Sequence, residues 1–408
     1  MVKEIAVQNQ YQKFPYPPIP FFGLPLKSQG KSLQWERGFE LLQKNLDQEI
    51  DPSHRNKRIL VAGCGTLEAL VVAQQHPYAK EVTAMDFSAP SLNILKKRLG
   101  YHKFKRILTL GLSRPALPPM RLIQQDLRSE INGPFDYITA TCVLHHDPEP
   151  ASLLKHLADQ LNPGGLMRVA TYPSQSRLWM RLTTAFFAQH NLTPDTPNLY
   201  KEALDCIMCL RKTHPIRHTF LLHKSAKSKS ELIDAFFHAC ECPLAPLEWK
   251  VAGEDAGLTW VGEDHDIQSQ SGFLSELLPQ TAKLKPWTRL QIVDDLLELC
   301  ANPVIWFWKN PCADSAKNEL RLIQPYLHKV TGHDFDMDIL TRRQLGFGLK
   351  RASLLLEKAG VTLAEAKKAL EDSVGPRTIA KKDGTEEVLN GLSLVDYHWE
   401  GLLNDARI

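Results

Sequence analysis

The chain has 408 residues, of which 43% are hydrophobic and 23% are charged, values that are ordinary for a globular protein with a sizeable core. The 49 Lys and Arg against 46 Asp and Glu leave a formal net charge of +3, a balance too mild to indicate a nucleic-acid-binding protein. The start, MVKEIAVQNQ, lacks the apolar core of a signal peptide, and no apolar run approaches the roughly 20 residues of a membrane span. We therefore expect a cytoplasmic protein that does not contact a membrane.

The N-terminal 32 residues are predicted to be irregular. Residues 10–26, QYQKFPYPPIPFFGLPL, are too rich in proline for a helix and too apolar for a free tail. We expect this segment to lie on the surface of the main domain or over its ligand cleft. Residues 33–49 carry apolar side chains at helical spacing and are predicted to form a helix.

Residues 58–172 alternate short apolar runs with amphipathic stretches. Such alternation, with continuous apolar strands, is typical of a parallel sheet that helices cover on both faces. Ser88, with Pro90 in the first turn, is predicted to open one of these helices. The predicted strands are residues 58–63, 81–86, 120–126, 135–141 and 165–172, and the predicted helices are residues 66–76, 88–100 and 150–161.

The C-terminal half is predicted to be mainly helical. We expect helices in 175–245, one or two strands in 246–265, helices again from 273, and a helical tail over 315–408. In that tail the capping box Thr362–Glu365 opens a helix and residues 381–385 form a turn. The predicted domains are a segment and helix covering the cleft (1–50), a main domain with a helical insertion at about 175–245 (51–310), and a helical C-terminal region (311–408).

The eight cysteines are scattered, and without an export signal we expect reduced thiols. Cys206 and Cys209, together with Cys240 and Cys242, have a spacing that zinc sites use. However, residues 202–212 read as a helix with both thiols on its apolar face. Buried structural cysteines are therefore favoured over a metal site.

The strongest chemical signal is the turn Gly63-Cys64-Gly65, which joins a buried strand to a helix. Glycines let the backbone turn sharply and approach a ligand closely. The helix N-terminus is expected to offer unpaired N–H groups and a positive dipole end. Dinucleotide enzymes use similar turns, but their third glycine is absent here, where Leu67 and Ala69 stand.

Acidic residues follow the next two predicted strands. Asp86 comes about 20 residues after the glycine turn, the spacing at which an acid accepts hydrogen bonds from ribose hydroxyls. The less favoured alternative is that Asp86 caps the helix opening at Ser88. Asp126 would accept from an adenine amino group, although a turn-forming role is an equal alternative.

Four segments resemble, in order and spacing, the motifs of class I S-adenosylmethionine-dependent methyltransferases: AGCGT, VTAMDFS, IQQDL, and FDYITATCVLHHDPEP with the PGG turn after it. The resemblance covers about a third of the chain closely. It implies an α/β fold with a doubly wound, mostly parallel, seven-stranded sheet, helical additions, and S-adenosylmethionine as cofactor. By the same resemblance, Gly63, Cys64 and Gly65 line the methionine part, Asp86 holds the ribose, Phe87 packs on the adenine, Asp126 and Leu127 contact the adenine edge, and Thr141 and Cys142 face the cofactor's amino end or the acceptor.

Two positions depart from the family pattern. Val61 stands where an acid is often found, and Leu67 stands where a glycine is common. Either change would weaken the affinity for the cofactor. They keep open the alternative that the chain is a non-catalytic, cofactor-binding module that regulates or scaffolds a partner.

Methyl transfer is an in-line displacement that depends mostly on positioning the nucleophile and excluding water. His145, His146 and Tyr172 are the catalytic candidates; either histidine would take a proton, with Asp147 orienting it. The alternative is that this loop shapes the pocket and caps the next helix. Tyr11, Tyr16 and Arg177 are the substrate-binding candidates, and each tyrosine has packing as its alternative role.

The segment from Thr141 to Leu144 lacks the Asn/Asp-Pro-Pro-aromatic motif of enzymes that methylate adenine or glutamine nitrogens. A small-molecule acceptor is therefore favoured. A protein acceptor, or an RNA acceptor with 315–408 as an RNA-binding appendage, are the alternatives. The lysines and arginines near residues 211–229 are interpreted as a solvated face.

Overall fold

The computed structural model divides into two compact units, which are described separately. The first unit comprises Met1–Tyr172, His238–Gln268 and Asn302–Ile323, and the second comprises Pro173–Phe237, Ser269–Ala301 and Gln324–Ile408. These borders fall at other residues than the expected borders at 50 and 310. The residues described are 2–26, 30–46, 55–112, 115–175, 177–212, 214–222, 228–264, 270–296, 302–311, 337–373, 377–380 and 386–389.

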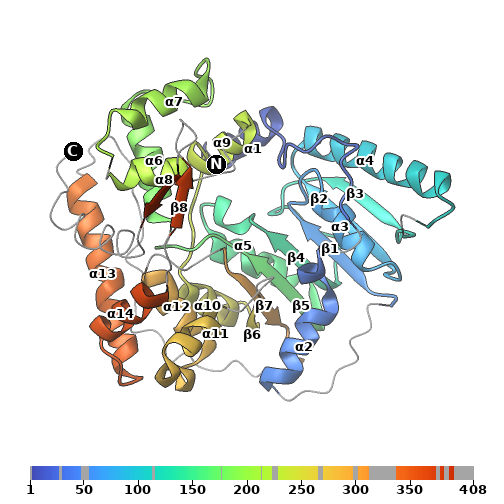
Figure 1. The fold of residues 1–408 in the computed structure, drawn as a ribbon. Helices are drawn as coiled ribbons and strands as arrows, with labels where there is room; N and C mark the ends of the chain where they lie inside the picture. The colour runs from blue at the N-terminus through green and yellow to red at the C-terminus, as the bar shows by residue number, and fades with distance from the viewer. Residues whose placement is uncertain are drawn as a thin grey trace. The chain divides into compact units, whose positions relative to one another are not determined.

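A seven-stranded sheet in the order β3-β2-β1-β4-β5-β7-β6 forms the centre of the first unit (Figure 1). Neighbours from β3 to β5 pair in parallel, whereas β7 is antiparallel to both β5 and β6. The predicted doubly wound, mostly parallel sheet is thus confirmed. The strands are β1 (Arg58–Ala62), β2 (Glu81–Asp86), β3 (Met120–Gln124), β4 (Phe135–Thr141), β5 (Leu161–Ala170), β6 (Thr259–Asp264) and β7 (Val304–Trp308).

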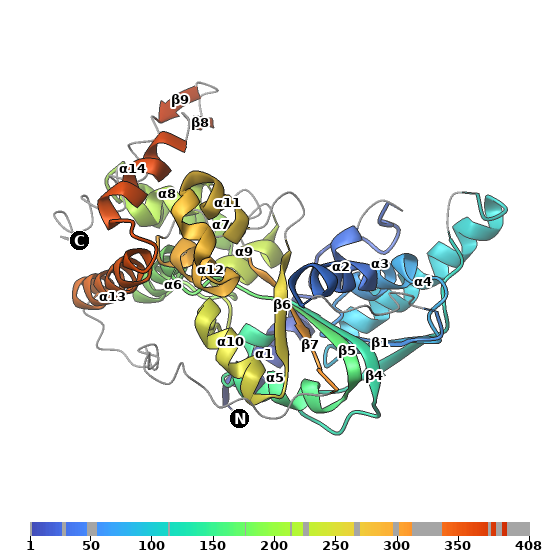
Figure 2. The same ribbon diagram turned by 90° about the horizontal axis from the view of Figure 1, so that it is seen from below.

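Helices cover both faces of this sheet, as Figure 2 shows. One face packs against α2 (Trp35–Leu46), α3 (Glu68–Gln75) and α4 (Ala89–Leu108), whose apolar side chains join one buried cluster with those of β1 and β2. The other face carries α5 (Pro150–Asp159), which packs beside α10 (Pro246–Asp255). Because both faces are covered, β1 and β2 are buried along almost their whole length.

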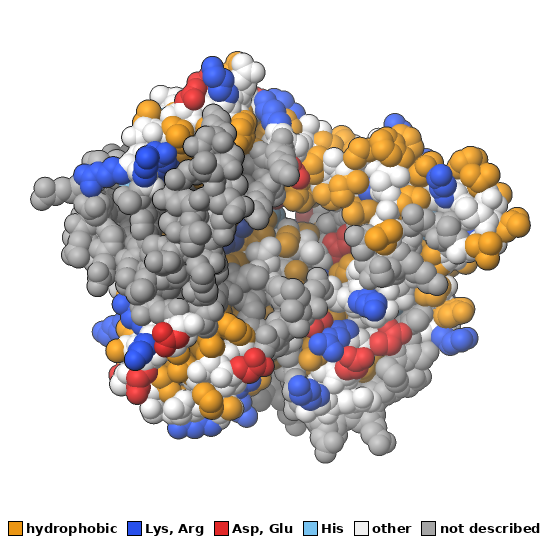
Figure 3. All heavy atoms as spheres, viewed as in Figure 1, with side chains coloured by type: hydrophobic (Ala, Val, Ile, Leu, Met, Phe, Trp, Pro, Cys, Tyr) orange, Lys and Arg blue, Asp and Glu red, His pale blue; other side chains and the backbone are white. Residues whose placement is uncertain are grey.

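Large apolar side chains at the far end of α4 lie on the surface instead of in this core. Figure 3 shows them gathered over α4, together with side chains of the N-terminal segment. Leu110 and Leu112, just beyond the helix, are 89% and 91% exposed. No helix among the described residues is long and apolar enough to cross a bilayer.

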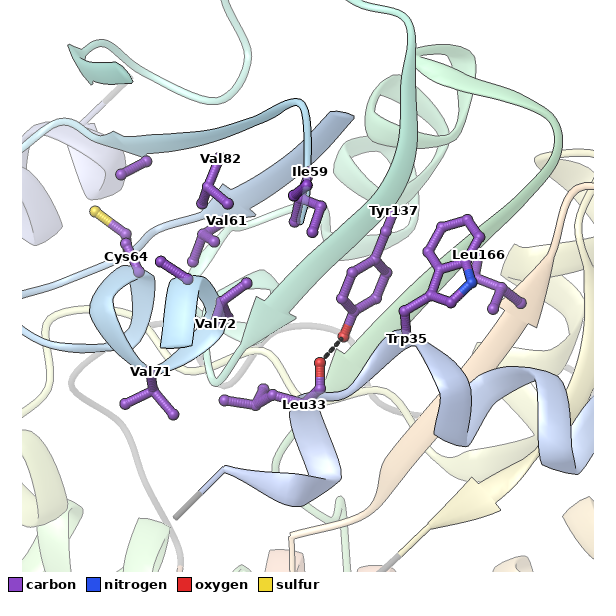
Figure 4. Close-up of a cluster of buried hydrophobic side chains, with 14 of the residues drawn as sticks. Leu33, Trp35, Ile59, Val61, Cys64, Val71, Val72, Val82, Tyr137 and Leu166 are labelled. Carbon is purple, nitrogen blue, oxygen red and sulfur yellow. Dashed lines mark hydrogen bonds between the residues drawn. The ribbon is translucent and has the colours of Figure 1, made fainter. Parts of the chain in front are cut away.

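The buried cluster contains one hydroxyl that is satisfied by the backbone. The Tyr137 hydroxyl donates to the carbonyl of Leu33 at 3.1 Å, as drawn beside Trp35 and Leu166 in Figure 4. Its ring stacks on Trp306, with ring centroids 5.7 Å apart. The 3₁₀ turn η1 (Lys31–Leu33) is thereby fixed to β4 through a fully buried side chain.

One prediction for the first unit was wrong. The N-terminus is irregular only from residue 14, because α1 (Val2–Lys13) forms in a stretch without Pro or Gly. Of the one or two strands expected in 246–265, one is present as β6, and residues 246–255 form the helix α10. Pro246 occupies its first turn, and the Glu248 carboxylate accepts from the Ala245 amide at 2.6 Å, which is a helix-start arrangement.

The second unit is mainly helical, as predicted for 175–245. Its elements are α6 (Leu178–Gln189), α7 (Leu199–Met208), α8 (Pro215–Leu222), α9 (Lys229–Phe236), α11 (Gln270–Leu277), η3 (Pro279–Lys283), α12 (Pro286–Asp295), α13 (Met337–Glu357), α14 (Leu363–Ser373), β8 (Arg377–Ala380) and β9 (Glu386–Leu389). The pairing of β8 with β9 contradicts a wholly helical tail. The predicted capping box is confirmed, since Thr362 and Glu365 exchange side-chain hydrogen bonds with each other's amides. The predicted turn at 381–385 lies outside the described residues.

A buried ion pair lies inside the second unit. Arg351 donates to Asp295 from Nε at 2.8 Å and from Nη2 at 2.6 Å. The neighbouring Asp294 accepts from the amides of Ser174 and Gln175. Asp294 therefore joins residues 174 and 175, at the start of the unit, to α12. Asp295 joins α12 to α13.

The prediction that the thiols of Cys206 and Cys209 lie on the buried apolar face of a helix was wrong. Cys209 is exposed and Cys206 only partly buried. The reason is that α7 ends at Met208 and buries Leu199, Ala203 and Ile207, so the thiols lie off its apolar face. In the first unit, Cys240 is buried, and its sulfur lies 3.8 Å from that of Cys242.

Candidate active site

The glycine turn after β1 has a backbone that requires glycine. Gly63 and Gly65 have φ of +64° and +52°, a region that L side chains rarely adopt. A Cβ on Gly63 would lie 2.5 Å from Val143, and one on Gly65 would lie 2.6 Å from the carbonyl oxygen of Tyr16. The turn is therefore held tightly between the loop after β4 and the N-terminal segment.

The amides of this turn are not unpaired, contrary to the prediction for the helix N-terminus. The Gly65 amide donates to Asp86 Oδ2 at 2.8 Å. The Thr66 amide donates to the Tyr16 carbonyl at 3.1 Å, and its hydroxyl donates to the Pro17 carbonyl at 2.7 Å. The sequence pattern did not reveal this because the carbonyls come from a segment about 50 residues away.

Asp86 ends β2 and is buried. Its Oδ1 accepts from the Ser88 amide at 2.7 Å, so the carboxylate joins the loops after β1 and β2. Burial raises the pKa of Asp86, while these two backbone hydrogen bonds lower it. The alternative that Asp86 caps α4 was wrong, because the Ser88 hydroxyl itself accepts from the Ser91 amide.

The N-terminal helix α1 lies along the same edge. The Ser88 hydroxyl donates to the Tyr11 carbonyl at 2.9 Å, and Gln12 Nε2 donates to the Phe87 carbonyl at 3.3 Å. The rings of Tyr11 and Phe87 meet edge to face at 6.1 Å. Residues 11–17 therefore run across the loops after β1 and β2.

The loop after β3 joins this edge through backbone contacts. The Gln125 amide donates to the Asp86 carbonyl at 3.0 Å. Asp126 is exposed and its Oδ1 accepts from the Arg128 amide at 2.8 Å, the turn-forming arrangement that the sequence left open. Leu127 is buried.

A polar network that sequence reasoning missed lies under the glycine turn. Glu68 Oε1 accepts from the hydroxyls of Thr141 at 2.7 Å and Thr139 at 3.2 Å. Arg168 Nη1 donates to Thr141 Oγ1 at 2.9 Å, and its Nε donates to the Ser32 carbonyl. Burial raises the pKa of Glu68 to about 7, although Thr141 and Arg168 lower it. An arginine in the otherwise apolar strand β5 was the signal that could have revealed this network.

Cys142, directly after β4, has a strained backbone. Its φ of +54° is unusual for a residue with a side chain and costs about 1–2 kcal/mol. Its amide donates to the Ala170 carbonyl at 2.8 Å, and Asn302 Nδ2 lies 4.0 Å from its sulfur. Strain of this kind clusters at functional positions.

His145 is fully buried and packs on Tyr172, with ring centroids 3.8 Å apart. Its Nδ1 accepts from the Tyr172 amide at 3.2 Å and lies 3.1 Å from the Thr171 hydroxyl. The hydrogen-bond pattern therefore places the proton of the neutral ring on Nε2. His145 thus fixes the chain at the end of β5.

His146 connects the His145–Tyr172 pair to the rings of Tyr11 and His238, since its ring centroid lies 4.2 Å from that of His145. Its Nδ1 lies 2.9 Å from the Cys240 carbonyl and donates to it, which puts the lone pair of the neutral ring on Nε2. Its ring stacks on His238 at 3.6 Å, and Tyr11 Oη lies 3.1 Å from His238 Nε2. His238 was missed, because 227 residues separate it from Tyr11.

Asp147 differs from its expected surroundings, whereas the roles of Tyr16 and Arg177 stay predictions. Asp147 does not orient a histidine; it pairs with Arg128 and accepts from the Glu149 amide, because the chain turns it toward the loop after β3. Tyr16 reaches the turn through its carbonyl. Arg177 is buried directly before α6 in the second unit.

Comparisons with known proteins agree with this geometry. Residues 34–203 match the profile of a family described as a methyltransferase domain. An uncharacterized protein of Synechococcus sp. is 29% identical over 181 residues, which are 43% of this chain and 39% of that protein. The trans-aconitate 2-methyltransferase of Deinococcus radiodurans is 28% identical over 190 residues, 41% of this chain and 66% of that enzyme. The chain thus spans less than two thirds of either relative's length.

A solved structure supports the fold. PKMT2 from Rickettsia typhi in complex with AdoHcy is similar over 88% of this chain and 75% of its own, with a TM-score of 0.50 and 14% identity. At that identity, the similarity shows the arrangement of strands and helices. The sheet order and the matched profile indicate the same family as this structural similarity. The chain therefore carries a methyltransferase domain of class I, and S-adenosylmethionine is the cofactor of that domain.

Proposed function

We propose that the chain transfers a methyl group from S-adenosylmethionine to a small-molecule acceptor held beside β4 and β5. One observation carries the proposal. The glycine turn, Asp86 and His146 all lie at the carboxyl ends of parallel strands, and the N-terminal segment contacts the turn, the loop after Asp86 and His146. Ligands bind at this edge in open α/β sheets.

The cofactor end of the proposed site fits the residues present. Gly63 and Gly65 leave a turn without side chains, beside Cys64. Each Asp86 oxygen accepts one amide and keeps a second lone pair, which suits the two hydroxyls of a ribose. In this proposal Phe87, Asp126 and Leu127 contact the adenine, and Thr141 and Cys142 face the amino end or the acceptor.

The acceptor end is assigned to the ring cluster around His146. His146 takes the acceptor's proton at Nε2, because the Cys240 carbonyl holds its Nδ1–H. Tyr11 and His238 orient the acceptor, while the buried His145 positions Tyr172. Tyr16 contributes its backbone, and the role of Arg177 stays a prediction.

Two relatives support a small-molecule acceptor. Besides the trans-aconitate 2-methyltransferase, a ubiquinone biosynthesis O-methyltransferase of Bordetella bronchiseptica is 29% identical over 128 residues. Their names refer to small acceptors. A hydroxyl acceptor carries a proton that must leave during the transfer, and His146 is assigned to receive it.

The test begins with the purified full chain and cell extract separated into small-molecule, protein and RNA fractions. We expect labelled methyl groups from S-adenosylmethionine to enter the small-molecule fraction. His146→Gln should slow this transfer by about 100-fold or more, with unchanged affinity for S-adenosylhomocysteine. His156→Gln, on α5, is the matched control and should behave like the unaltered chain.

Three results would contradict the proposal. Label in the protein or RNA fraction alone would reassign the acceptor class. Binding of the cofactor without transfer to any fraction would favour a non-catalytic module. Full activity of His146→Gln would remove the proton-transfer role from this histidine.

A further inference from the structure

The side chains of Asp86 and Glu68 both lie next to the glycine turn, and their carboxylate oxygens have different hydrogen-bond partners. Both oxygens of Asp86 accept backbone amides. Glu68 accepts two threonine hydroxyls at Oε1, whereas its Oε2 accepts no hydrogen bond from the described residues. Glu68 is also partly exposed. A carboxylate oxygen is therefore presented at the start of α3, one turn after Gly65.

The groups around Glu68 make its charge sensitive to a bound cation. Arg168, from β5, is the charged group that acts on this carboxyl among the described residues. Burial raises the pKa of Cys64, in the turn, and of Tyr137, on β4, so both stay neutral near pH 7. The pKa of Glu68 itself is about 7. A nearby positive charge would favour its ionised form.

We propose that Glu68 Oε2 pairs with the positively charged α-amino group of bound S-adenosylmethionine, and that this pairing releases the proton of Glu68 to solvent. The inference rests on the proposed function, because it takes the cofactor's amino acid end to lie at the glycine turn. Strand β1 supplies no acid that could pair with this amine, since its sequence is RILVA and Val61 is fully buried.

The threonines and the arginine have matching roles in this proposal. Thr139 and Thr141 point their hydroxyls at Oε1, which fixes the carboxyl plane and leaves Oε2 for the ligand. Arg168 balances the charge of the ionised carboxylate through Thr141. A carboxylate with fixed orientation binds an ammonium group without a large loss of side-chain freedom.

The experiment is calorimetric titration of the full chain in two buffers with different ionisation enthalpies. S-adenosylhomocysteine is the first ligand, since it has the α-amino group but no charged sulfur. With a pKa of about 7, Glu68 should release about half a proton per ligand bound at pH 7. The Kd should fall close to tenfold between pH 6 and pH 8. Methylthioadenosine, which lacks the amino acid end, should release no proton.

Variants separate Glu68 from other titrating groups. Glu68→Gln keeps an oxygen for the threonines, and we expect it to abolish the proton release and to weaken S-adenosylhomocysteine about tenfold at pH 8, with methylthioadenosine unaffected. Glu130→Gln, an exposed acid after β3, is the matched control. Thr141→Val removes a hydrogen bond to the ionised carboxylate, so the release should move to higher pH.

The outcomes are distinguishable. Binding of S-adenosylhomocysteine without proton release, or with unchanged release in Glu68→Gln, overturns the assignment of Glu68 and leaves the proposed function standing. Equal release with methylthioadenosine also overturns it, because that ligand has no amine. If the folded chain binds neither S-adenosylmethionine nor S-adenosylhomocysteine, both proposals are wrong.

Discussion

Asp86 accepts the amide hydrogen of Gly65 at 2.8 Å, and this hydrogen bond joins the ends of β1 and β2. The same carboxylate also holds the Ser88 amide. A single side chain therefore shapes the two loops that are proposed to hold the cofactor. Substitution of Asp86 is therefore expected to lower both the stability of the fold and the affinity for the cofactor. A residue that only contacts the ligand would change the affinity alone.

We expect Asp86→Ala to lower the free energy of unfolding by about 2–4 kcal/mol, because the amides of Gly65 and Ser88 lose a charged acceptor. Its Kd for S-adenosylhomocysteine should rise at least tenfold. Urea unfolding and calorimetry measure the two effects. Asp159→Ala, at an exposed acid that ends α5, is the control. A folded Asp86→Ala chain that binds normally would refute the ribose assignment.

Gly65→Ala should destabilise the chain more than Gly257→Ala. Both glycines have positive φ, so either alanine costs about 1–2 kcal/mol of backbone strain. Only the Cβ at Gly65 meets a neighbour, the Tyr16 carbonyl at 2.6 Å, whereas none lies within 4 Å at Gly257. Thermal melting gives the stability difference, and limited proteolysis should cut near residues 14–20 faster in Gly65→Ala. Equal melting temperatures would contradict this packing.

Tyr11→Phe removes the hydroxyl that lies 3.1 Å from His238 Nε2 but keeps the ring. We expect kcat to fall about tenfold, the loss typical of one orienting hydrogen bond of roughly 1–1.5 kcal/mol, with no change in cofactor affinity. Steady-state kinetics with the identified acceptor measure this split. Tyr78→Phe, at an exposed ring, should leave both constants unchanged. If Tyr11→Phe changes only the affinity for the cofactor, Tyr11 contacts the cofactor and not the acceptor.

Glu68 should also make stability depend on pH. Its folded pKa of about 7 exceeds its ordinary 4.5, so the folded chain holds this proton more tightly than the unfolded chain. The resulting stability is present below pH 4.5 and is lost as pH rises toward 7. Relative to the unaltered chain, Glu68→Gln should therefore gain about 2 kcal/mol between pH 5 and pH 7.5. Parallel urea titrations without ligand check this, and a pH-independent difference would contradict it.

The ion pair of the second unit gives a prediction independent of the site. Arg351→Met leaves the buried Asp295 without its guanidinium partner and should cost about 3–5 kcal/mol. The double variant Arg351→Met with Asp295→Leu removes both charges and should recover most of that loss. Chemical unfolding of the three chains gives the comparison. If the double variant is no more stable than the single one, the ion pair is not what the single change disturbs.

Local sequence patterns predicted those elements of the fold that depend on residues close together in the sequence. Strands β1 to β5 follow from continuous apolar runs, and the glycine turn and Asp86 follow from their spacing. Residues 304–308, VIWFW, form β7 but were not predicted as a strand, since they directly follow a stretch of helical periodicity. The strand expected within 246–265 is β6, whereas residues 246–255 form a helix with Pro246 in its first turn.

The interactions that sequence patterns could not predict join distant segments. Glu68 meets Thr141 across 73 positions, and Tyr11 meets His238 across 227. Neither pair has a spacing rule, because the fold sets the distance between them. The same holds for the carbonyls of Tyr16 and Pro17 at Thr66, which replace the expected unpaired amide.

The order of strands in the sheet has a consequence for synthesis of the chain. Strand β7 lies between β5 and β6, yet the ribosome makes it last, more than 130 residues after β5. At a synthesis rate of about 5–20 residues per second, β7 becomes available to pair with β5 on the order of ten seconds after β5 is made. During that time its edge, with Met167 and Val169 beside it, is open to other chains. A fragment that stops at Tyr172 would keep that edge permanently, so shortened versions of the protein should aggregate unless they include residue 308.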